Sequence, residues 1–345
     1  MELFTSTSTW ARQWIVRDAA SGLRAIVVID SLVRGPAFGG IRRMTYASEA
    51  AAHADAIELA AAMTRKCALA ELPAGGGKTV VLDHPGFDVV AGHAALGRAI
   101  EQLGGLYVCG PDVGTSAREL DLVRAHTRFV NPAGNDAGAS TAHGVLAGLR
   151  GLSRVVFGDE ALAGRRVVIQ GLGAVGSALA RTLLAAGARV AGWDRDRVAC
   201  ERARAFGVEL LDEQGLWTEP CDVFMPCALG SVLTRERCER ARWRAICGSA
   251  NNQIAAPEVE TLLHERGIVW APDEVVSAGA VIEGVHTFTQ GEAGRAEAER
   301  GIEAIAITCA RVVEASRREG VPTGVLARSL ARELTDGLGL GLGPA

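Results

Sequence analysis

One stretch, residues 165–194, constrains the fold of this chain more than any other. A β-branched run ends at Gln170 and leads into a Gly-x-Gly-x-x-Gly loop, residues 171–176, which opens an Ala/Leu-rich helix through about Ala186. A further apolar strand, residues 188–193, ends in Asp194. Strand, glycine loop, helix, strand and acid in this order predict a parallel α/β unit that binds a dinucleotide.

The chemistry of a dinucleotide gives each part of this unit a role. The glycines allow a tight turn and close approach of the pyrophosphate, and the helix N-terminus offers unpaired N–H groups and the positive end of its dipole. Asp194 would accept hydrogen bonds from ribose hydroxyls and repel a 2′-phosphate, which favours NAD over NADP, although Arg195 and Arg197 would act in the opposite direction. We therefore expect NAD as the cofactor, with a purely structural glycine turn as the alternative.

A second stretch, residues 65–78, places two lysines in apolar, glycine-rich surroundings. Burying an ammonium group costs free energy unless the group is paired or its pKa falls. Two nearby cations would each disfavour the charge of the other, which is one way to bring a lysine base toward neutral pH. The pattern therefore indicates that Lys66 and Lys78 take part in chemistry. The alternative is that both stems lie along apolar surface with their ammonium groups in water.

Length and composition fit a two-domain cytoplasmic enzyme. The 345 residues are enough for two cores. With 36 basic against 40 acidic residues, nothing suggests nucleic acid or an anionic membrane as a partner. The eight cysteines show no CxxC spacing and the seven histidines no HxxxH spacing, so we expect reduced thiols and no dedicated metal site. The first residues lack the pattern of a signal peptide, and the chain has no long uncharged apolar run.

Alternating strands and helices predict two α/β domains. The expected elements are strands at 13–16, 25–29, 79–82 and 106–109, a helix capped by Ser48, and a helix over 88–103. The cluster of turn residues at 131–138 is the expected joint. We place the first domain at residues 1–140 and the dinucleotide-binding domain at 141–324, and expect a helix over about 325–345 to pack back on the first domain.

Several blocks of sequence, taken in order, resemble one known family. They are residues 35–40, 63–78, 111–115, 171–176, 226–230, 248–253, 271–279 and 319–323. Over nearly its whole length the chain resembles the amino acid dehydrogenases that act on glutamate, leucine, phenylalanine and valine, and in length it is similar to the leucine and phenylalanine branch.

This resemblance implies a fold and an activity. The fold would be α/β with two domains, an N-terminal substrate and oligomerisation domain and a Rossmann-type dinucleotide-binding domain, with the active-site cleft between them. The activity would be NAD-dependent oxidative deamination of an L-amino acid to its 2-oxo acid and ammonia, in a homo-oligomer.

The resemblance also assigns roles in catalysis. Lys66 matches the lysine that binds the substrate carboxylate, Lys78 the catalytic lysine, and Asp112 the carboxylate that exchanges protons with the amine. At Gly39 and Gly40 the backbone could approach the substrate because no Cβ intervenes. For Asp112 alone, an ordinary turn residue is the alternative.

Further positions match the cofactor site of the family. Thr141 resembles a hydroxyl that contacts the nicotinamide carboxamide, with a helix N-cap as the alternative. The other matching positions are Gly171, Gly173, Ala174, Val175, Gly176, Asp194, Arg195, Cys227, Ala228 and Asn252.

One position departs from the family pattern. Ser277 stands where the family has an asparagine that helps to fix substrate and nicotinamide. A serine hydroxyl is shorter and has fewer hydrogen-bonding sites. Either the site is rearranged for an unusual substrate, which we favour, or activity is weakened.

Four positions of the resemblance bear on the substrate side chain. Phe38 replaces the lysine of glutamate enzymes, so acidic substrates are disfavoured. Gly110 and Gly284 stand where leucine enzymes carry alanine and valine, while Val281 keeps an apolar wall. The implied pocket is wide and apolar and suits phenylalanine or tryptophan, unless side chains such as His286 or Phe288 refill the space.

Three functions therefore stay open at this point. The first is an NAD-dependent dehydrogenase of aromatic amino acids, and the second is the same type of enzyme acting on leucine or valine. The third is a non-catalytic dinucleotide-binding relative, which only Ser277 supports.

Overall fold

The structure is a computed structural model that describes residues 12–336 and divides into two compact units. Within that range unit 1 comprises residues 12–135, 281–298 and 331–336, and unit 2 comprises residues 136–280 and 299–330. The first crossing between units falls inside the cluster of turn residues at 131–138. Residues 281–298 belong to unit 1, whereas the sequence boundaries put them in the dinucleotide-binding domain.

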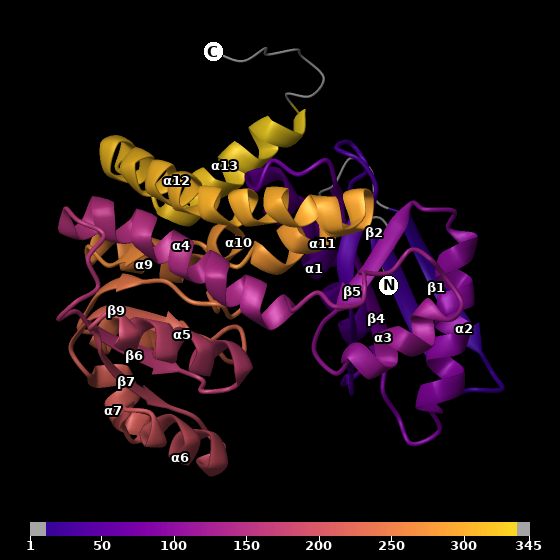
Figure 1. The fold of residues 1–345 in the computed structure, drawn as a ribbon, viewed down its shortest axis with the longest axis horizontal. Coiled ribbons are helices and arrows are strands. Elements are labelled where there is room, and N and C mark those ends of the chain that lie inside the picture. The colour runs from indigo at the N-terminus through magenta and orange to yellow at the C-terminus, as the bar shows by residue number, and fades with distance from the viewer. Residues whose placement is uncertain (1–11, 337–345) are drawn as a thin grey trace. The chain divides into compact units, whose positions relative to one another are not determined.

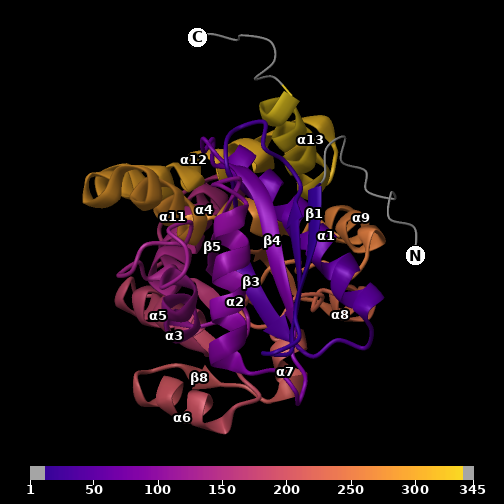
Figure 2. The ribbon, with the colours of Figure 1, turned by 90° about the vertical axis from the view of Figure 1, so that its right-hand side faces the viewer.

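Unit 1 is built on a five-stranded mixed sheet. Its elements are β1 (Arg12–Asp18), β2 (Leu23–Ile29), β3 (Ala37–Met44), α1 (Glu49–Leu69), β4 (Gly75–Leu82), α2 (Val89–Gln102), β5 (Tyr107–Pro111) and α3 (Ala117–Arg124) (Figure 1). The strand order is β1-β2-β4-β3-β5, with antiparallel pairing from β1 to β4 and parallel pairing of β3 with β4 and β5. One face packs on α1 through Ile26, Val28 and Val80, and α2 runs along the other face (Figure 2).

The triple glycine of β4 lets its neighbours approach the strand closely. A Cβ added at Gly76 would lie 2.0 Å from the backbone nitrogen of Thr64 in α1, and one at Gly75 would lie 1.9 Å from the carbonyl oxygen of Ser31. Both distances are far below a van der Waals contact, so a side chain at either position would force α1 or the Ser31 loop away from the strand. The glycines therefore set the position of the two elements that carry Lys66 and Lys78.

Local sequence signals account for most helix boundaries in unit 1. The Ser48 hydroxyl caps α1 by accepting a hydrogen bond from the Ala51 N–H at 3.1 Å, as expected from the sequence. Asp88 caps α2 in the same way. The expected strand at 79–82 is too short, because β4 begins at Gly75 and contains Lys78. Glycine disfavours strands, so the sequence pattern hid this first half of β4.

Unit 2 is a doubly wound α/β unit with a parallel sheet. Its elements are α4 (Ala137–Phe157), β6 (Arg166–Gln170), α5 (Ala174–Ala185), β7 (Arg189–Trp193), α6 (Arg197–Ala205), β8 (Glu209–Leu210), α7 (Glu213–Thr218), β9 (Cys221–Pro226), α8 (Arg235–Arg240), β10 (Trp243–Ile246), α9 (Pro257–Glu265), β11 (Val269–Trp270) and α10 (Asp273–Val276). The strand order is β11-β10-β9-β6-β7-β8, and every pair is parallel. The order reverses between β6 and β9, which is where such sheets bind nucleotides.

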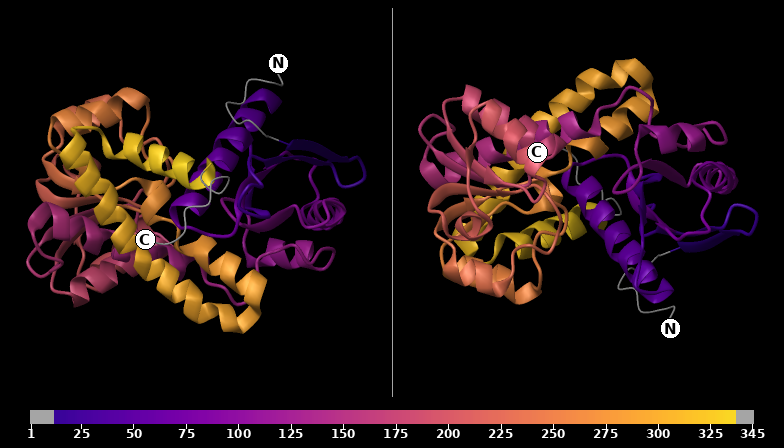
Figure 3. Two further views of the ribbon diagram at one scale, coloured as in Figure 1. Left: turned by 90° about the horizontal axis from the view of Figure 1, so that it is seen from above. Right: turned by 90° about the horizontal axis from the view of Figure 1, so that it is seen from below.

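The last elements are shared between the units. They are α11 (Gly279–Gln290), a 3₁₀ turn at Gly291–Gly294, α12 (Arg295–Glu319) and α13 (Thr323–Asp336), which closes the described chain (Figure 3). Unit 1 takes most of α11 and the last six described residues of α13, whose Leu334 carbonyl accepts a 2.8 Å hydrogen bond from Arg34. The remainder of the expected helix, residues 337–345, lies outside the described residues. No helix within residues 12–336 is long and apolar enough to cross a membrane.

Candidate active site

Lys78 and Asp112 form a buried ion pair in unit 1. The Lys78 Nζ lies 2.6 Å from Asp112 Oδ2, and only 7% and 11% of the two side chains is exposed. Arg42 Nε donates to the same oxygen at 3.0 Å, so two cations share one carboxylate. Lys78 comes from β4, Arg42 from β3 and Asp112 from the turn that follows β5. The three adjacent strands thus bring together charges that are far apart in the sequence.

The same contacts shift the pKa values of the pair. Burial lowers the pKa of Lys78 and nearby Arg42 lowers it further, while Asp112 opposes both, and the net shift is downward. Burial alone would raise the pKa of Asp112, but the charges of Lys78 and Arg42 outweigh it and bring that pKa to about 2. Asp112 is therefore a carboxylate at neutral pH, and Lys78 loses its proton more easily than an ordinary lysine.

Lys66 lies near the C-terminal end of α1 and is only 8% exposed. Helix α1 packs directly on β4, the strand that carries Lys78. Both lysines are therefore buried, which disagrees with ammonium groups that reach into water from surface turns. The structure excludes that alternative for the two side chains.

Gly39 and Gly40 of β3 pack so closely against the neighbouring strands that neither has room for a side chain. In the sheet register Gly40 pairs with Gly110, and its strand β3 lies between β4 and β5. A Cβ on Gly40 would meet Asp112 Cβ at 2.7 Å, and one on Gly39 would lie 1.7 Å from the Gly77 carbonyl oxygen. Close strand packing thus requires glycine at 39 and 40, a reason independent of any substrate contact.

Asn131 borders both glycines that were expected to widen the substrate pocket. Its backbone N–H donates to the Cys109 carbonyl at 2.7 Å, which places it beside β5. Within residues 12–336, a Cβ on Gly110 would have Asn131 Cβ as its only neighbour within 4 Å, at 3.8 Å, so the described residues leave the space above Gly110 open. A Cβ on Gly284 would lie 2.8 Å from Asn131 Oδ1. An amide oxygen therefore occupies the space that Gly284 was expected to open, so the widening expected from the sequence holds at Gly110 and not at Gly284.

Helix α11 faces this region with an aromatic contact. The Phe288 ring meets Phe38 edge to face, with centroids 5.7 Å apart. Val281, Gly284 and Phe288 are spaced three and four residues apart and so share one face of the helix. Phe38 is 6% exposed, so most of its ring surface is already covered by protein.

The glycine loop of unit 2 has the features that a pyrophosphate requires. Gly171 has φ +97°, which only glycine adopts easily, and a Cβ on Gly176 would lie 1.9 Å from the Gly171 carbonyl oxygen. Among the residues that the structure describes, none comes within 4 Å of a Cβ added on Gly173, and no side chain caps the first turn of α5. The N–H groups of Ala174 and Val175 therefore begin the helix beside open space, as anion binding requires.

Asp194 lies against this loop. Its Oδ2 accepts the Leu172 N–H at 2.7 Å and its Oδ1 accepts the Asp196 N–H at 2.8 Å. Each carboxylate oxygen keeps a further lone pair for a ribose hydroxyl. Arg195 is exposed next to it. The residues present thus fit a dinucleotide with free ribose hydroxyls.

Other predicted cofactor residues gather at the switch point of the sheet. The Cys227 N–H donates to the Gln170 carbonyl at 2.7 Å, and a Cβ added on Gly171 would lie 2.8 Å from Ala228 Cβ. Asn252 has φ +50° and donates its N–H to Asp273 Oδ2 at 2.9 Å. These contacts hold all three segments at the carboxyl ends of β6, β9 and β10.

The structure also addresses Thr141 and Ser277. Helix α4 begins at Ala137 with Asp136 as its N-cap, so Thr141 lies inside the helix and does not open it. The alternative role of Thr141 as a helix N-cap was wrong, because the Asp136 side chain caps α4 instead. Ser277 donates its hydroxyl to the Asp273 carbonyl at 2.7 Å, which gives it a local role at the end of α10.

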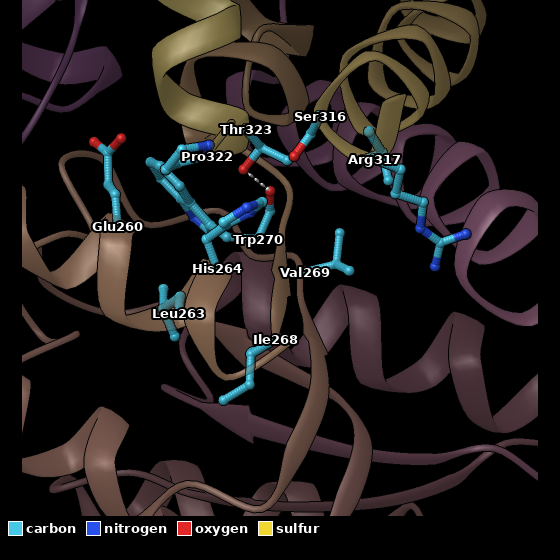
Figure 4. A pocket seen from close by; sticks show the side chains of 12 residues that line it. Glu260, Leu263, His264, Ile268, Val269, Trp270, Ser316, Arg317, Pro322 and Thr323 are labelled. Carbon is cyan, nitrogen blue, oxygen red and sulfur yellow. Dashed lines mark hydrogen bonds between the residues drawn. The ribbon is translucent and has the colours of Figure 1, made fainter. Parts of the chain in front are cut away.

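Unit 2 also contains a cavity. It has a volume of about 200 Å³ and lies between α9, β11, the end of α12 and the start of α13 (Figure 4). Leu263, Ile268 and Val269 form an apolar side, and Thr323 donates a 2.6 Å hydrogen bond to the Trp270 carbonyl. None of the predicted site residues lines it. Over residues 12–336, no three His, Cys, Asp or Glu side chains gather as a metal site.

Sequence reasoning missed two residues of the unit 1 site, Arg42 and Asn131. Arg42 follows Gly40 by two positions in a strand and so shares its face, a signal that alternation could have supplied. Asn131 was interpreted as the first residue of the joint between the domains, and no local signal in the sequence indicates its backbone hydrogen bond to Cys109 of β5.

Comparisons with known proteins agree with this geometry. Residues 11–129 match the Glu/Leu/Phe/Val dehydrogenase dimerisation domain, and residues 194–319 match the Glutamate/Leucine/Phenylalanine/Valine dehydrogenase domain. Residues 148–232 match the NAD binding domain of D-isomer specific 2-hydroxyacid dehydrogenases. The chain is 38% identical to leucine dehydrogenase of Thermoactinomyces intermedius over 325 residues, which cover 92% of this chain and 88% of that protein.

Two further relatives extend the comparison. Valine dehydrogenase of Streptomyces albus is 36% identical, with 92% of this chain and 90% of that protein covered. The crystal structure of L-tryptophan dehydrogenase from Nostoc punctiforme superposes with a TM-score of 0.82 at 29% identity, covering 96% of this chain and 97% of that one. These matches confirm the resemblance found in the sequence: the chain belongs to the Glu/Leu/Phe/Val dehydrogenase family and is an NAD-dependent amino acid dehydrogenase.

Proposed function

We propose that this enzyme interconverts L-phenylalanine or L-tryptophan with the 2-oxo acid and ammonia. The observation that supports an aromatic substrate best is the open space above Gly110, where an added Cβ would have a single neighbour within 4 Å in the described part of the chain. A planar ring can lie on a surface without side chains, and the Phe38–Phe288 pair offers aromatic contact nearby. The structural similarity to L-tryptophan dehydrogenase is a second support.

In this proposal the charges of unit 1 divide the work of deamination. Lys66 binds the substrate carboxylate, and the Asp112 carboxylate accepts a hydrogen bond from the substrate amine. NAD, held on the glycine loop and Asp194, would supply the acceptor for the hydride from the substrate Cα. Before that transfer the Asp112 carboxylate takes a proton from the substrate ammonium. Lys78, as a neutral amine, then takes a proton from the water that attacks the iminium carbon. Asp112 returns its proton to the nitrogen, and as the C–N bond breaks the carbinol hydroxyl proton passes to solvent and ammonia leaves.

Branched aliphatic substrates are the second candidate. Leucine and valine dehydrogenases are 34% to 38% identical to this chain, and Asn131 fills part of the space beside Gly284. A narrower site would favour leucine or valine. The two candidates share every step of the chemistry and differ only in how the side chain packs.

A substrate panel on matched glycine variants tests the proposal. For the wild type, kcat/KM of NADH formation should be higher with L-phenylalanine or L-tryptophan than with L-leucine or L-valine, and L-glutamate should be nearly inert. Gly110→Ala fits the backbone and should lower aromatic kcat/KM by about tenfold to a hundredfold, since one misplaced methyl is worth about 1–3 kcal/mol. Gly86→Ala, in an exposed loop, is the control and should change nothing. A wild type that prefers leucine or valine would overturn the aromatic assignment.

The quaternary structure is part of the same proposal. The match of residues 11–129 to a dimerisation domain supports a homo-oligomer. Edge strand β1 carries Ile15 with 77% of its surface exposed, as a subunit interface would. Light scattering on the purified chain measures the subunit number directly, and a monomer at micromolar concentration would contradict the proposed homo-oligomer.

A further inference from the structure

Arg42 is a third charged group at the Lys78–Asp112 pair and is held at both ends. Its Nε donates to Asp112 Oδ2 at 3.0 Å, while its Nη1 reaches both oxygens of Asp55 in α1 at 3.3 and 3.2 Å. The Tyr46 hydroxyl donates to Asp55 Oδ2 at 2.6 Å and so fixes that carboxylate in turn. Arg42 therefore links helix α1 to the turn after β5, with its side chain 14% exposed.

The buried charges around Lys78 balance one another, and this balance affects how Lys78 can act as a base. Two cations, Lys78 and Arg42, face two carboxylates, Asp112 and Asp55. A lysine that acts as a base must pass through the neutral amine. Without another cation, the buried Asp112 carboxylate would then lose its only counter-charge and would compete for the proton.

An arginine is the side chain that prevents this competition. A guanidinium stays protonated in proteins, so its charge does not depend on the state of Lys78. Because both cations bond to the same oxygen, Arg42 can keep Asp112 ionised when Lys78 is neutral. It also repels a proton on Lys78, which agrees with the lowered pKa of that lysine.

We propose that Arg42 is a positioning residue of the deamination site, which keeps the Asp112 carboxylate charged and aimed at Lys78 while Lys78 is uncharged. Asp55 and Tyr46 anchor Arg42 in that position. This inference rests on the roles proposed above for Lys78 and Asp112. Among residues 12–336, the charged or titratable groups that act on the pair are Arg42 from β3, Tyr46 from the segment after it, Tyr107 from β5 and Asp55 from α1, which also carries Lys66.

The composition of the chain makes a direct test possible. Lys66 and Lys78 are the two lysines of the sequence, and its other Lys/Arg positions are all arginine. Protein labelled with ¹³Cε-lysine therefore gives two side-chain signals, and Lys66→Gln identifies which one belongs to Lys78. The titration midpoint of Lys78 can then be measured by NMR on the full chain, independently of any turnover.

Arg42→Gln should raise the titration midpoint of Lys78 by about one pH unit, since the repelling charge is gone and Asp112 binds Lys78 alone. Below the midpoint this lowers the fraction of neutral amine about tenfold, so the acid side of the kcat/KM profile should move upward by the same amount. Arg42→Lys should recover most of the midpoint. Asp55→Asn should give a smaller shift, since Arg42 keeps its charge but loses its anchor.

Arg43→Gln is the matched control. Arg43 is the next residue of β3, is 20% exposed against 14% for Arg42, and points to the opposite face, where it lies 3.8 Å from Asp83. Arg43→Gln should lower the free energy of unfolding to a similar degree as Arg42→Gln, yet leave the titration midpoint of Lys78 unchanged. This separates a loss of stability from a loss of positioning.

Two results would separate failure of this inference from failure of the proposed function. An Arg42→Gln variant that folds and binds NADH with a Lys78 midpoint within about 0.3 pH unit of wild type would overturn the role of Arg42, whatever the substrate proves to be. A wild type with no amino acid turnover but a shifted midpoint in Arg42→Gln would overturn the proposed function and leave the charge relation of the cluster in place.

Discussion

Replacing Lys78 with alanine should stop turnover while the fold and cofactor binding survive. The structure explains why the fold tolerates the change. Asp112 keeps its 3.0 Å contact with Arg42, so its buried carboxylate is not left without a cation. Burial of the Lys78 ammonium disfavours its charged form, so replacing Lys78 also removes the cost of keeping that charge away from water. We expect a change of less than about 2 kcal/mol in the free energy of unfolding.

The kinetic effect should be much larger. A positioned general base contributes about 10²- to 10⁴-fold, which is about 3–5 kcal/mol of transition-state stabilisation. That loss should appear in kcat. Lys66→Ala is the matched comparison, because it removes the other buried lysine. It should raise KM for the amino acid about tenfold or more, since a charge-assisted contact is worth about 1.5–3 kcal/mol.

The assay combines steady-state NADH formation with NADH binding followed by fluorescence. Binding should be unchanged in both variants, because the predicted cofactor residues of the glycine loop and Asp194 lie in unit 2 and both lysines lie in unit 1. A Lys78→Ala enzyme with kcat within tenfold of wild type would refute the assignment of Lys78 as the base. An equal rise in KM for both variants would indicate two binding lysines and no base.

Two further predictions concern the cofactor and the fold. The kcat/KM with NAD should exceed that with NADP by at least about tenfold, or about 1.4 kcal/mol. Asp194→Ala should reduce this preference for NAD. Equal use of both cofactors by the wild type would show that Arg195 or Arg197 dominates over Asp194. Gly39→Ala should destabilise unit 1 by more than about 3 kcal/mol in urea unfolding, since its Cβ would lie 1.7 Å from the Gly77 carbonyl oxygen, and a midpoint equal to that of Gly86→Ala would contradict this.

Elements with strong local signals could be predicted from the sequence, and those that depend on tertiary contacts could not. The glycine loop, α5 and β7 follow from glycine spacing and apolar runs, and Ser48 and Asp88 cap the expected helices. The first half of β4 was missed because three glycines have no strand preference of their own. The return of residues 281–298 to unit 1 was missed because nothing in a helical sequence states which core it joins.

The candidate site shows the same division. The identities of Lys78 and Asp112 came from motifs, but their 2.6 Å contact depends on the parallel pairing of β3 with β4 and β5. That pairing also determines which other residues matter. It brings Arg42 to Asp112, and the bridge beside β5 brings Asn131 to Gly110 and Gly284. In the proposals made above, Arg42 acts on proton transfer and Asn131 on the space for the substrate side chain. On that basis variants at Asn131 should alter substrate preference without moving the titration of Lys78.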